Sequence, residues 1–518
     1  MQQTDLDRFR QLCEGLSRPE AYPEPLDPGG VERIETHISV VFLAGEHAYK
    51  LKKPLDLAFL DFTDPQRRRH FCEEEIRLNR RTAPDIYLDT VPVTGTPEAP
   101  RIGGDGEPME WAVRMRRFPQ QALLSSLASN LTGEQFDALG SMVAGFHEAA
   151  DRRPPPRDAV AAAVTPALDN CRALADAVPA RLVERVRAVE AWTQRTADEL
   201  GPVFRRREAE GLVRECHGDL HLNNLLFRDG RFQAFDAIEF DPALRWIDTM
   251  SDLAFLLMDL DHAGLSGGAR RVLNEYLEQT GDYDGLTMLR FFLTYRAMVR
   301  AKVAALRSAP GAASEVAGYL DLATRYIEPT HPVLAVTGGA SGTGKSTLAR
   351  SLVEAAGFIR LRSDVERKRL AGVDRGERRN TGVGRDLYGP RMSHLTYERL
   401  ATLARGLLRA GWPVVVDAAF LKADRRRRFH ALARAEGVPF RLLWLEMPEA
   451  RLRARVRARA RAGTDASDAD EAVLQHQLDT LDAPDEVPSG ELLRNPGRRE
   501  LDRLAALVRG DGDAHGVD

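Results

Sequence analysis

The sequence predicts a multidomain protein in which an α+β part is followed by an α/β part. Strand hairpins come early in residues 1–327, and long helices follow them. Beyond residue 333, short apolar strands alternate with helices, which is the pattern of a parallel sheet. The segment "EPTHP" (328–332) carries two prolines and indicates a linker between the two parts. A chain of 518 residues is long enough for about three folded units of roughly 100–200 residues each.

The elements of the first part follow in chain order. We expect a short helix within 1–23, a strand hairpin over 35–53, a charged helix over 64–82, strands near 86–94 and 109–118, and helices over 120–150 and 158–210. Trp246, Met250, Leu253 and Leu257 recur at helical spacing, so residues 242–264 are predicted to form one long helix. Further helices are expected up to residue 327.

Composition and charge exclude several classes of protein. The chain is 43% hydrophobic and 29% charged with a formal net charge of −4, so no global field favours nucleic acid or a membrane surface. Its four cysteines lie far apart without metal-like spacing, which favours a reducing compartment over a disulfide framework. The start has no apolar signal region, and no apolar run approaches the roughly 20 residues of a membrane helix. We therefore expect a cytoplasmic protein.

The strongest motif opens the second part. Residues 339–346, "GASGTGKS", fit the pattern G-x-x-x-x-G-K-[ST], with an apolar strand before them and a helix after them. In such a loop the backbone N–H groups and the lysine face phosphate oxygens, and the serine hydroxyl ligates Mg²⁺. The motif predicts a site for ATP and Mg²⁺ formed by Gly339, Ala340, Ser341, Gly342, Thr343, Gly344, Lys345, Ser346 and Thr347.

Two acids and a run of arginines lie further along this part. Asp417 ends the strand "PVVVD", so its carboxylate is delivered to the C-terminal edge of the sheet, where α/β proteins bind ligands. Asp364 follows the second strand, and capping of the next helix is the alternative role for it. Six arginines alternate in "RLRARVRARAR" (451–461) and are predicted to lie around one helix.

Residues 330–510 resemble the small P-loop kinases, among them gluconate kinase, polynucleotide 5′-kinase and zeta-toxin-like proteins. The resemblance implies a P-loop NTPase domain with a parallel α/β sheet over 333–510. It implies that Asp364 contacts the acceptor hydroxyl and that Asp417 holds Mg²⁺ or its water. It also implies that one or two of the six arginines reach phosphate from a lid, and a solvated helix is the alternative for each of them.

A second motif, "HGDLHLNN" (217–224), precedes a predicted hairpin. Phosphoryl transfer needs an acid near the acceptor hydroxyl, a Mg²⁺ ligand a few residues on, and a second ligand from a neighbouring strand. Asp219, Asn224 and Asp236 fit these three roles in that order. Asp241 competes with Asp236, but the gap of twelve residues between Asn224 and Asp236 suits a tight hairpin better.

This motif resembles the catalytic loop of the aminoglycoside phosphotransferase and choline kinase branch of the protein-kinase-like fold, over about residues 30–325. The resemblance implies a bilobal fold, with an N-terminal segment and N-lobe in 1–118 and a C-lobe in 119–327. It implies that Lys50 in "HAYKLKKP" binds ATP, with Lys52 as the alternative. Glu75 is implied as the partner of this lysine, with Glu74 as the alternative.

Two further features belong to this resemblance. Asp252 in "MSDLAFLL" resembles the buried acid that supports the catalytic loop, and a polar surface position is the alternative for it. The stretch "FLAGEHAY" offers a single glycine where the family has a glycine-rich loop. The tandem order of the two motifs resembles bacterial proteins in which an aminoglycoside-phosphotransferase-like domain is fused to a P-loop ATP-binding domain.

The favoured function is a phosphotransferase with two ATP sites, each moving a γ-phosphoryl group to a small-molecule hydroxyl. One alternative is a regulatory protein with a ligand-sensing kinase-like domain and a P-loop NTPase switch. Another is a nucleic-acid 5′-kinase in the second part, which the arginine run at 425–428 favours and the balanced net charge disfavours. The expected partners are ATP and small hydroxyl-bearing substrates, with no membrane. The tail, 511–518, is expected to be disordered.

Overall fold

We describe the chain from a computed structural model. The described residues are 2–24, 26, 30–57, 60–152, 158–307, 311–373, 389–462 and 471–511. They form two compact units. Unit 1 comprises Met1–Leu131, Gly145–Asp176 and Thr193–Asp259, and unit 2 comprises Thr132–Ala144, Ala177–Trp192 and Leu260–Asp518. The predicted tail lies outside the described residues from 512 on, and the domain boundaries drawn from the sequence stay predictions.

A six-stranded antiparallel sheet in the order β1-β2-β3-β8-β6-β7 forms the N-terminal part of unit 1. Its strands are β1 Val31–Glu35, β2 Ser39–Ala44, β3 His47–Lys52, β6 Tyr87–Thr96, β7 Ala99–Ile102 and β8 Glu110–Arg116. Strand β3 is internal, because Lys50 pairs with Val41 of β2 and with Val113 of β8. Lys50 and Lys52 emerge on the same face of the sheet, since they lie two residues apart on one strand. Gly45 forms the tight turn before β3, with φ of 57°.

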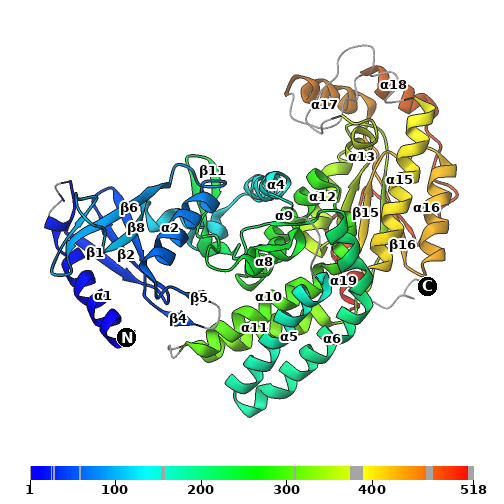
Figure 1. Cartoon of the computed structure of the whole chain (residues 1–518). Coiled ribbons are helices and arrows are strands. Elements are labelled where there is room, and N and C mark those ends of the chain that lie inside the picture. Colours follow the sequence, from blue (N-terminus) through cyan, green and yellow to red (C-terminus); the bar gives the residue numbers. More distant parts are fainter. Residues whose placement is uncertain are drawn as a thin grey trace. The chain divides into compact units, whose positions relative to one another are not determined.

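Helix α2, Pro65–Asn79, packs against β6 and β8 (Figure 1). Asp64 caps its start, because the carboxylate accepts a hydrogen bond of 2.9 Å from the N–H of Gln66, and proline occupies the first helical position. The buried side of the helix includes Cys72 and Ile76, which belong to the apolar core. Glu75 is on the same side and is fully enclosed. A buried carboxylate needs charged partners, and β3 supplies them.

The remaining described strands and α-helices up to residue 262 follow in chain order. They are α1 Gln2–Leu16, β4 Asp56–Leu57, β5 Leu60–Asp61, α3 Leu124–Leu127, α4 Gly133–Ala149, α5 Ala159–Ala177, α6 Ala180–Ala209, β9 Val213–Glu215, β10 Leu225–Arg228, β11 Arg231–Ala234, α7 Pro242–Arg245, β12 Trp246–Asp248 and α8 Thr249–His262. Strands β10 and β11 form the hairpin that the sequence predicts after the second motif.

The prediction of one long helix over 242–264 is wrong. Trp246 lies in β12, which pairs with β9, and α8 begins only at Thr249. Asp248 explains the break. Its carboxylate accepts two hydrogen bonds, of 2.8 and 2.9 Å, from the buried guanidinium of Arg207, and a third of 2.8 Å from the N–H of Met250. This buried ion pair fixes the start of α8 and overrides the helical spacing of Trp246.

Unit 2 contains a five-stranded sheet in the order β14-β15-β13-β16-β17, and every pair of neighbouring strands is parallel. The predicted parallel α/β sheet is therefore confirmed. Its strands are β13 Leu334–Gly338, β14 Ile359–Arg362, β15 Val414–Asp417, β16 Phe440–Trp444 and β17 Leu492–Arg494. Helices α12 and α19 cover one face, and α15 and α16 cover the other (Figure 1).

Among the described residues after 262, the α-helices of unit 2 are α9 Ser266–Thr280, α10 Leu286–Leu306, α11 Ala312–Ile327, α12 Lys345–Ala356, α13 Ser363–Leu370, α15 Pro390–Arg409, α16 Ala423–Ala435, α17 Glu449–Ala462, α18 Glu471–Thr480 and α19 Arg498–Arg509. Helix α9 contacts both β14, at the edge of the sheet, and α12. Across the described ranges, no helix combines the length and the apolar character that crossing a membrane requires.

Candidate active sites

Lys50 is the centre of the first site. Its Nζ donates to Glu75 Oε1 at 2.8 Å and to Asp236 Oδ1 at 2.5 Å. Glu75 is fully buried, whereas 44% of the Asp236 side chain is exposed. The ammonium is thus anchored on one side and reaches an open carboxylate on the other. Glu74, the alternative partner, instead contacts Arg77 and Arg245.

A second lysine extends this cluster. Lys52 Nζ donates to Glu75 Oε2 at 2.8 Å and also to Glu239 Oε1. Burial acts to raise the pKa of Glu75, but the charges of the two lysines outweigh it and hold that pKa at about 2. Burial raises the pKa of Glu239, and the charge of Glu75 adds to this effect, so that Lys52 and Lys50 only partly offset it. No role was expected for Glu239 from the sequence, where its only signal is its position three residues after Asp236.

The backbone at Asp236 is bent so that its carboxylate reaches Lys50. Its φ is 62°, in the left-handed region that residues with a Cβ rarely occupy. Two hydrogen bonds fix this bend: the N–H of Asp236 donates to Tyr87 Oη at 3.1 Å, and the N–H of Ala237 donates to Asn79 Oδ1 at 2.9 Å. Asp241 serves a different purpose, since it caps α7 by accepting a hydrogen bond from the N–H of Ala243.

The loop before β10 brings Asp219 and Asn224 together. Asn224 Nδ2 donates to Asp219 Oδ2 at 3.1 Å and to the Asp219 carbonyl at 3.0 Å, which leaves the amide oxygen of Asn224 as an acceptor. His221 Nε2 lies 3.3 Å from Asp219 Oδ2. The carbonyl of Asn224 accepts from the N–H of Phe235 at 3.0 Å. Asn224 is therefore beside the residue that precedes Asp236.

Asp252 supports this loop from beneath. Its carboxylate accepts hydrogen bonds from the backbone N–H of His217 at 3.0 Å and from that of Gly218 at 2.8 Å. It also lies 3.1 Å from His147 Nε2. Burial acts to raise the pKa of Asp252, but these hydrogen bonds outweigh it and bring that pKa to about 2. Burial lowers the pKa of His217, whose neutral ring donates from Nε2 to the Phe235 carbonyl and accepts from the N–H of Asp219 at Nδ1.

The second site is the loop between β13 and α12. Gly339, Gly342 and Gly344 have φ of 120°, 89° and 104°, so side chains are disfavoured at all three. A Cβ on Gly339 would also collide with the carbonyl oxygen of Leu445. Lys345 Nζ donates to the carbonyls of Gly339 and Ala340 at 2.9 and 2.8 Å and is thus held inside the curve of the loop.

Neighbouring elements fix this loop from outside. Gln477 of α18 accepts a hydrogen bond of 2.7 Å from the N–H of Ser341. Arg455 of α17 donates from Nη1 to the Gly342 carbonyl at 3.2 Å. Among the arginines of α17, Arg453 and Arg457 instead pair with Glu449 and Glu471. Arg455 is therefore the arginine of α17 that the described contacts place at the loop.

Asp417 stands at the end of β15, next to β13. It is buried, and its Oδ2 accepts no hydrogen bond from any described residue. A buried carboxylate oxygen without a described donor fits a Mg²⁺ ion, and the half-buried Ser346 in the first turn of α12 offers a hydroxyl ligand of the kind that Mg²⁺ accepts. In the first site, the oxygens of Asn224 and Asp236 likewise form a donor set that suits Mg²⁺.

Asp364 lies in the first turn of α13 and is not its cap. The cap position is Arg362, without a side-chain hydrogen bond, so the capping alternative for Asp364 is wrong. Its Oδ1 accepts from Arg367 Nη1 at 2.5 Å, and 24% of the side chain is exposed. The carboxylate is thus oriented by an arginine one turn later and still accessible.

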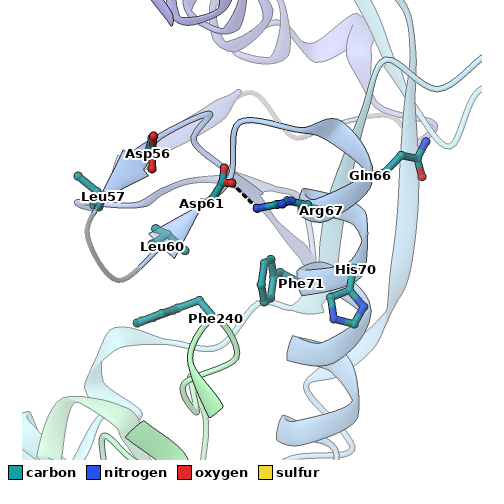
Figure 2. A pocket seen from close by; sticks show the side chains of 9 residues that line it. All are labelled: Asp56, Leu57, Leu60, Asp61, Gln66, Arg67, His70, Phe71 and Phe240. Carbon is teal, nitrogen blue, oxygen red and sulfur yellow. Dashed lines mark hydrogen bonds and ion pairs between the residues drawn. The ribbon is translucent and has the colours of Figure 1, made fainter. Parts of the chain in front are cut away.

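A cavity of about 730 Å³ lies elsewhere in unit 1. Figure 2 shows that it is lined by the β4–β5 hairpin, the first half of α2 and Phe240, with Asp61 paired to Arg67 across its upper part. Phe71 and Phe240 supply aromatic walls. None of the predicted site residues lines it, so it adds no group to either site.

Family models match both parts of the chain. The model of a family described as "Phosphotransferase enzyme family" matches residues 58–289, and the model of a family described as "AAA domain" matches residues 334–484. The two matches contain the motif at 217–224 and the P-loop. They confirm the resemblance stated for each part of the chain.

Relatives align across both regions. "Uncharacterized protein Rv2004c" of Mycobacterium tuberculosis H37Rv is 33% identical over 410 residues, which cover 77% of this chain and 80% of the relative. "Uncharacterized protein Mb2027c" of Mycobacterium bovis matches with the same values.

Two solved structures overlap one part of the chain each. A choline/ethanolamine kinase family protein from Mesorhizobium loti is 13% identical with a TM-score of 0.40, covering 61% of this chain and 95% of that protein. A gluconokinase from Sinorhizobium meliloti 1021 is 25% identical with a TM-score of 0.23, covering 35% of this chain and 94% of that protein. These TM-scores are too low to add to the family matches. The chain belongs to the family of the mycobacterial protein Rv2004c, and it is an ATP-dependent kinase that joins a phosphotransferase-family domain to a P-loop domain.

Proposed function

We propose that the chain transfers γ-phosphoryl groups from ATP at two separate sites, each to a hydroxyl of a small molecule. The observation that supports this proposal is that each unit offers a lysine and an acid of the required kind. In unit 1 Lys50 contacts Asp236, and in unit 2 Lys345 lies inside the loop while Asp417 presents a carboxylate oxygen without a described donor. Each set contains a cation for phosphate oxygens and carboxylate ligands suited to a metal ion. Each also has an accessible acid, Asp219 or Asp364, for the acceptor.

At the first site, Lys50 binds phosphate oxygens of ATP, and Glu75 holds the ammonium in place. Asp219 orients the acceptor hydroxyl and takes its proton, because the Asn224 amide and His221 fix the carboxylate while 37% of its side chain is exposed. Asn224 and Asp236 would hold Mg²⁺, which would neutralise charge on the phosphates.

At the second site, the backbone N–H groups of the loop and the N-terminus of α12 face the phosphates, with Lys345 beside them. Ser346 and Asp417 would hold Mg²⁺. Asp364 orients the acceptor hydroxyl, and Arg455 turns from the Gly342 carbonyl to a phosphate oxygen when nucleotide binds. The arginine fork suits that contact, since it binds phosphate with two N–H groups.

The test is a transfer assay with γ-labelled ATP and a mixture of sugars, amino alcohols, aminoglycosides, nucleosides and a 5′-hydroxyl oligonucleotide. Wild type is compared with Asp219→Asn and with Lys345→Ala. We expect two labelled products in wild type, one of which each variant loses while it keeps the other. The losses should be complete within detection, because each variant lacks a group required by one site only.

Other outcomes separate the alternatives. A protein that labels no acceptor but hydrolyses ATP in a Lys345-dependent way would be an NTPase switch with a ligand-sensing domain. Labelling of the oligonucleotide alone would make the second site a nucleic-acid 5′-kinase. Loss of both products in Lys345→Ala would show that the first site does not use ATP independently.

A further inference from the structure

Helix α9 completes the free edge of the parallel sheet. Strand β14 is an edge strand, and edge strands leave backbone groups unpaired. The buried side chain of Asn274 satisfies two of these groups, because its Nδ2 donates to the Phe358 carbonyl at 3.2 Å and its Oδ1 accepts from the N–H of Arg360 at 2.7 Å. The amide thus takes the place of a neighbouring strand and fixes α9 against β14.

Glu278 lies one helical turn after Asn274 and faces the same strand. Its side chain is fully buried, and its Oε1 accepts from Arg360 Nε at 2.8 Å and pairs with Arg360 Nη2 at 2.6 Å. Its Oε2 accepts from Arg362 Nη1 at 3.3 Å. One carboxylate of α9 therefore pairs with two arginines of β14.

Arg362 connects this carboxylate to the P-loop site. It is the last residue of β14, and it pairs in the parallel register with Asp417, the last residue of β15. Its Nε lies 4.0 Å from Asp417 Oδ2, the oxygen that accepts no hydrogen bond from a described residue. Charge-assisted hydrogen bonds from arginine to carboxylate are about 2.7–2.9 Å long, so Arg362 stops short of one.

We propose that Glu278 is a positioning residue for the P-loop site, because it draws Arg362 away from Asp417 and keeps Asp417 available to Mg²⁺. This inference rests on the function proposed above for Asp417. Without the charge of Glu278, Arg362 is free of its pull and can close the 4.0 Å gap between its Nε and Asp417 Oδ2. A full ion pair there would compete with the metal ion. Glu278 lies within the region matched by the phosphotransferase family, so the P-loop site depends on a residue outside the matched AAA domain.

The test measures metal binding to the full-length protein, with Mn²⁺ as the probe. Electron paramagnetic resonance titrations with saturating ADP report bound Mn²⁺, and an Asp236→Asn background removes the ligand of the first site. In this background, Glu278→Gln should weaken Mn²⁺ binding by about 10-fold or more, which is the usual effect of removing a group that orients metal ligands. Glu275→Gln is the matched control, since Glu275 lies on the same helix and accepts a hydrogen bond from Ser141.

Arg362→Gln shows whether the effect passes through Arg362. With this substitution alone, the protein should bind Mn²⁺ at least as tightly as the Asp236→Asn background protein does, because the competing guanidinium is gone. Combined with Glu278→Gln, it should restore binding to within about threefold of the background. A merely structural role of Glu278 would not be cancelled in this way.

Three results would overturn the inference. The first is unchanged Mn²⁺ binding in a folded Glu278→Gln protein. The second is that Glu278→Gln weakens Mn²⁺ binding by the same factor whether residue 362 is arginine or glutamine. The third is that Arg362→Gln alone weakens Mn²⁺ binding by 10-fold or more. This result would exclude competition by Arg362 even if the Glu278→Gln protein does not fold. If the Asp236→Asn background itself binds no Mn²⁺ with ADP, the proposed function of the P-loop site fails, and this inference fails with it.

Discussion

Lys52 and Glu239 form an ion pair that is enclosed by protein, with 0% and 4% of their side chains exposed. Glu239 is three residues after Asp236, and Lys52 is two residues after Lys50. The pair therefore ties the segment that carries Asp236 to the strand that carries Lys50. Because Glu75 bridges the two lysines, the groups form a row of alternating charges that runs from Asp236 through Lys50, Glu75 and Lys52 to Glu239.

Replacing either lysine of this row of charges should have a different effect on stability and on transfer. Lys52→Met leaves Glu239 and one oxygen of Glu75 buried without a cation, which costs about 3–5 kcal/mol. Lys50→Met leaves Glu75 paired to Lys52 and Asp236 half-exposed, so stability should fall less while transfer at the first site is lost. Urea unfolding and the transfer assay measure the two effects. Lys53→Met, which removes a lysine paired with the exposed Glu35, is the control. A smaller loss of stability in Lys52→Met than in Lys50→Met would contradict the assignment of Lys52 to the buried end of this row.

Asp236→Asn should lower transfer at the first site far more than Asp241→Asn does. Asp236 contacts Lys50 and would hold the metal ion, whose stabilisation of charge is largest in the transition state. Asp241 only caps the four-residue helix α7. Steady-state kinetics should show a fall in kcat of about 10²-fold or more for Asp236→Asn with ATP affinity largely kept. The reverse ranking would assign the metal ligand to Asp241.

Local patterns explain what the sequence predicted well. The P-loop follows from a few adjacent residues whose strand, turn and helix are each determined by nearby chemistry. Asp219 and Asn224 are five residues apart in one loop, and the structure brings them into direct contact. Lys50 and Glu75 are 25 residues apart and also meet, because the strand and the helix each place a charged side chain on a buried face.

Long-range burial explains what the sequence did not predict. Glu239 and Glu278 read as ordinary charged residues, and only the packed structure shows that each is enclosed with arginine or lysine partners. Trp246 continues a helical pattern but lies in β12, since the pairing of Arg207 with Asp248 decides where α8 begins. These contacts join residues more than 30 positions apart, beyond the reach of periodicity.

The support beneath the catalytic loop should depend on pH. The pKa of Asp252 is about 2 in the folded protein, below the usual value of about 3.9 for an unfolded chain. Its ionised form therefore contributes about 2–3 kcal/mol of stability at neutral pH, and this contribution is lost as the pH falls from about 5 toward 2. Asp252→Asn should be less stable than wild type at pH 7, and the gap in melting temperature should narrow by pH 3. A gap that stays constant would contradict the low pKa.

Asp364→Ala should leave the P-loop site able to bind ATP but poor at transfer. In the proposed site, Lys345 and the loop hold the nucleotide and Asp364 orients the acceptor. The kcat should therefore fall by roughly 10²–10⁴-fold with ATP affinity nearly unchanged. Stability should also hold, because Asp364 does not cap α13 and its contact with Arg367 is partly exposed. Asp424→Ala, which removes an exposed acid from the first turn of α16, is the matched control and should keep normal turnover. On both variants, isothermal titration with ATP measures the affinity for ATP, thermal melting measures stability, and steady-state kinetics measure kcat. Normal kcat in Asp364→Ala would remove this residue from the active site, and a lowered melting temperature beside it would leave a structural role for the contact with Arg367.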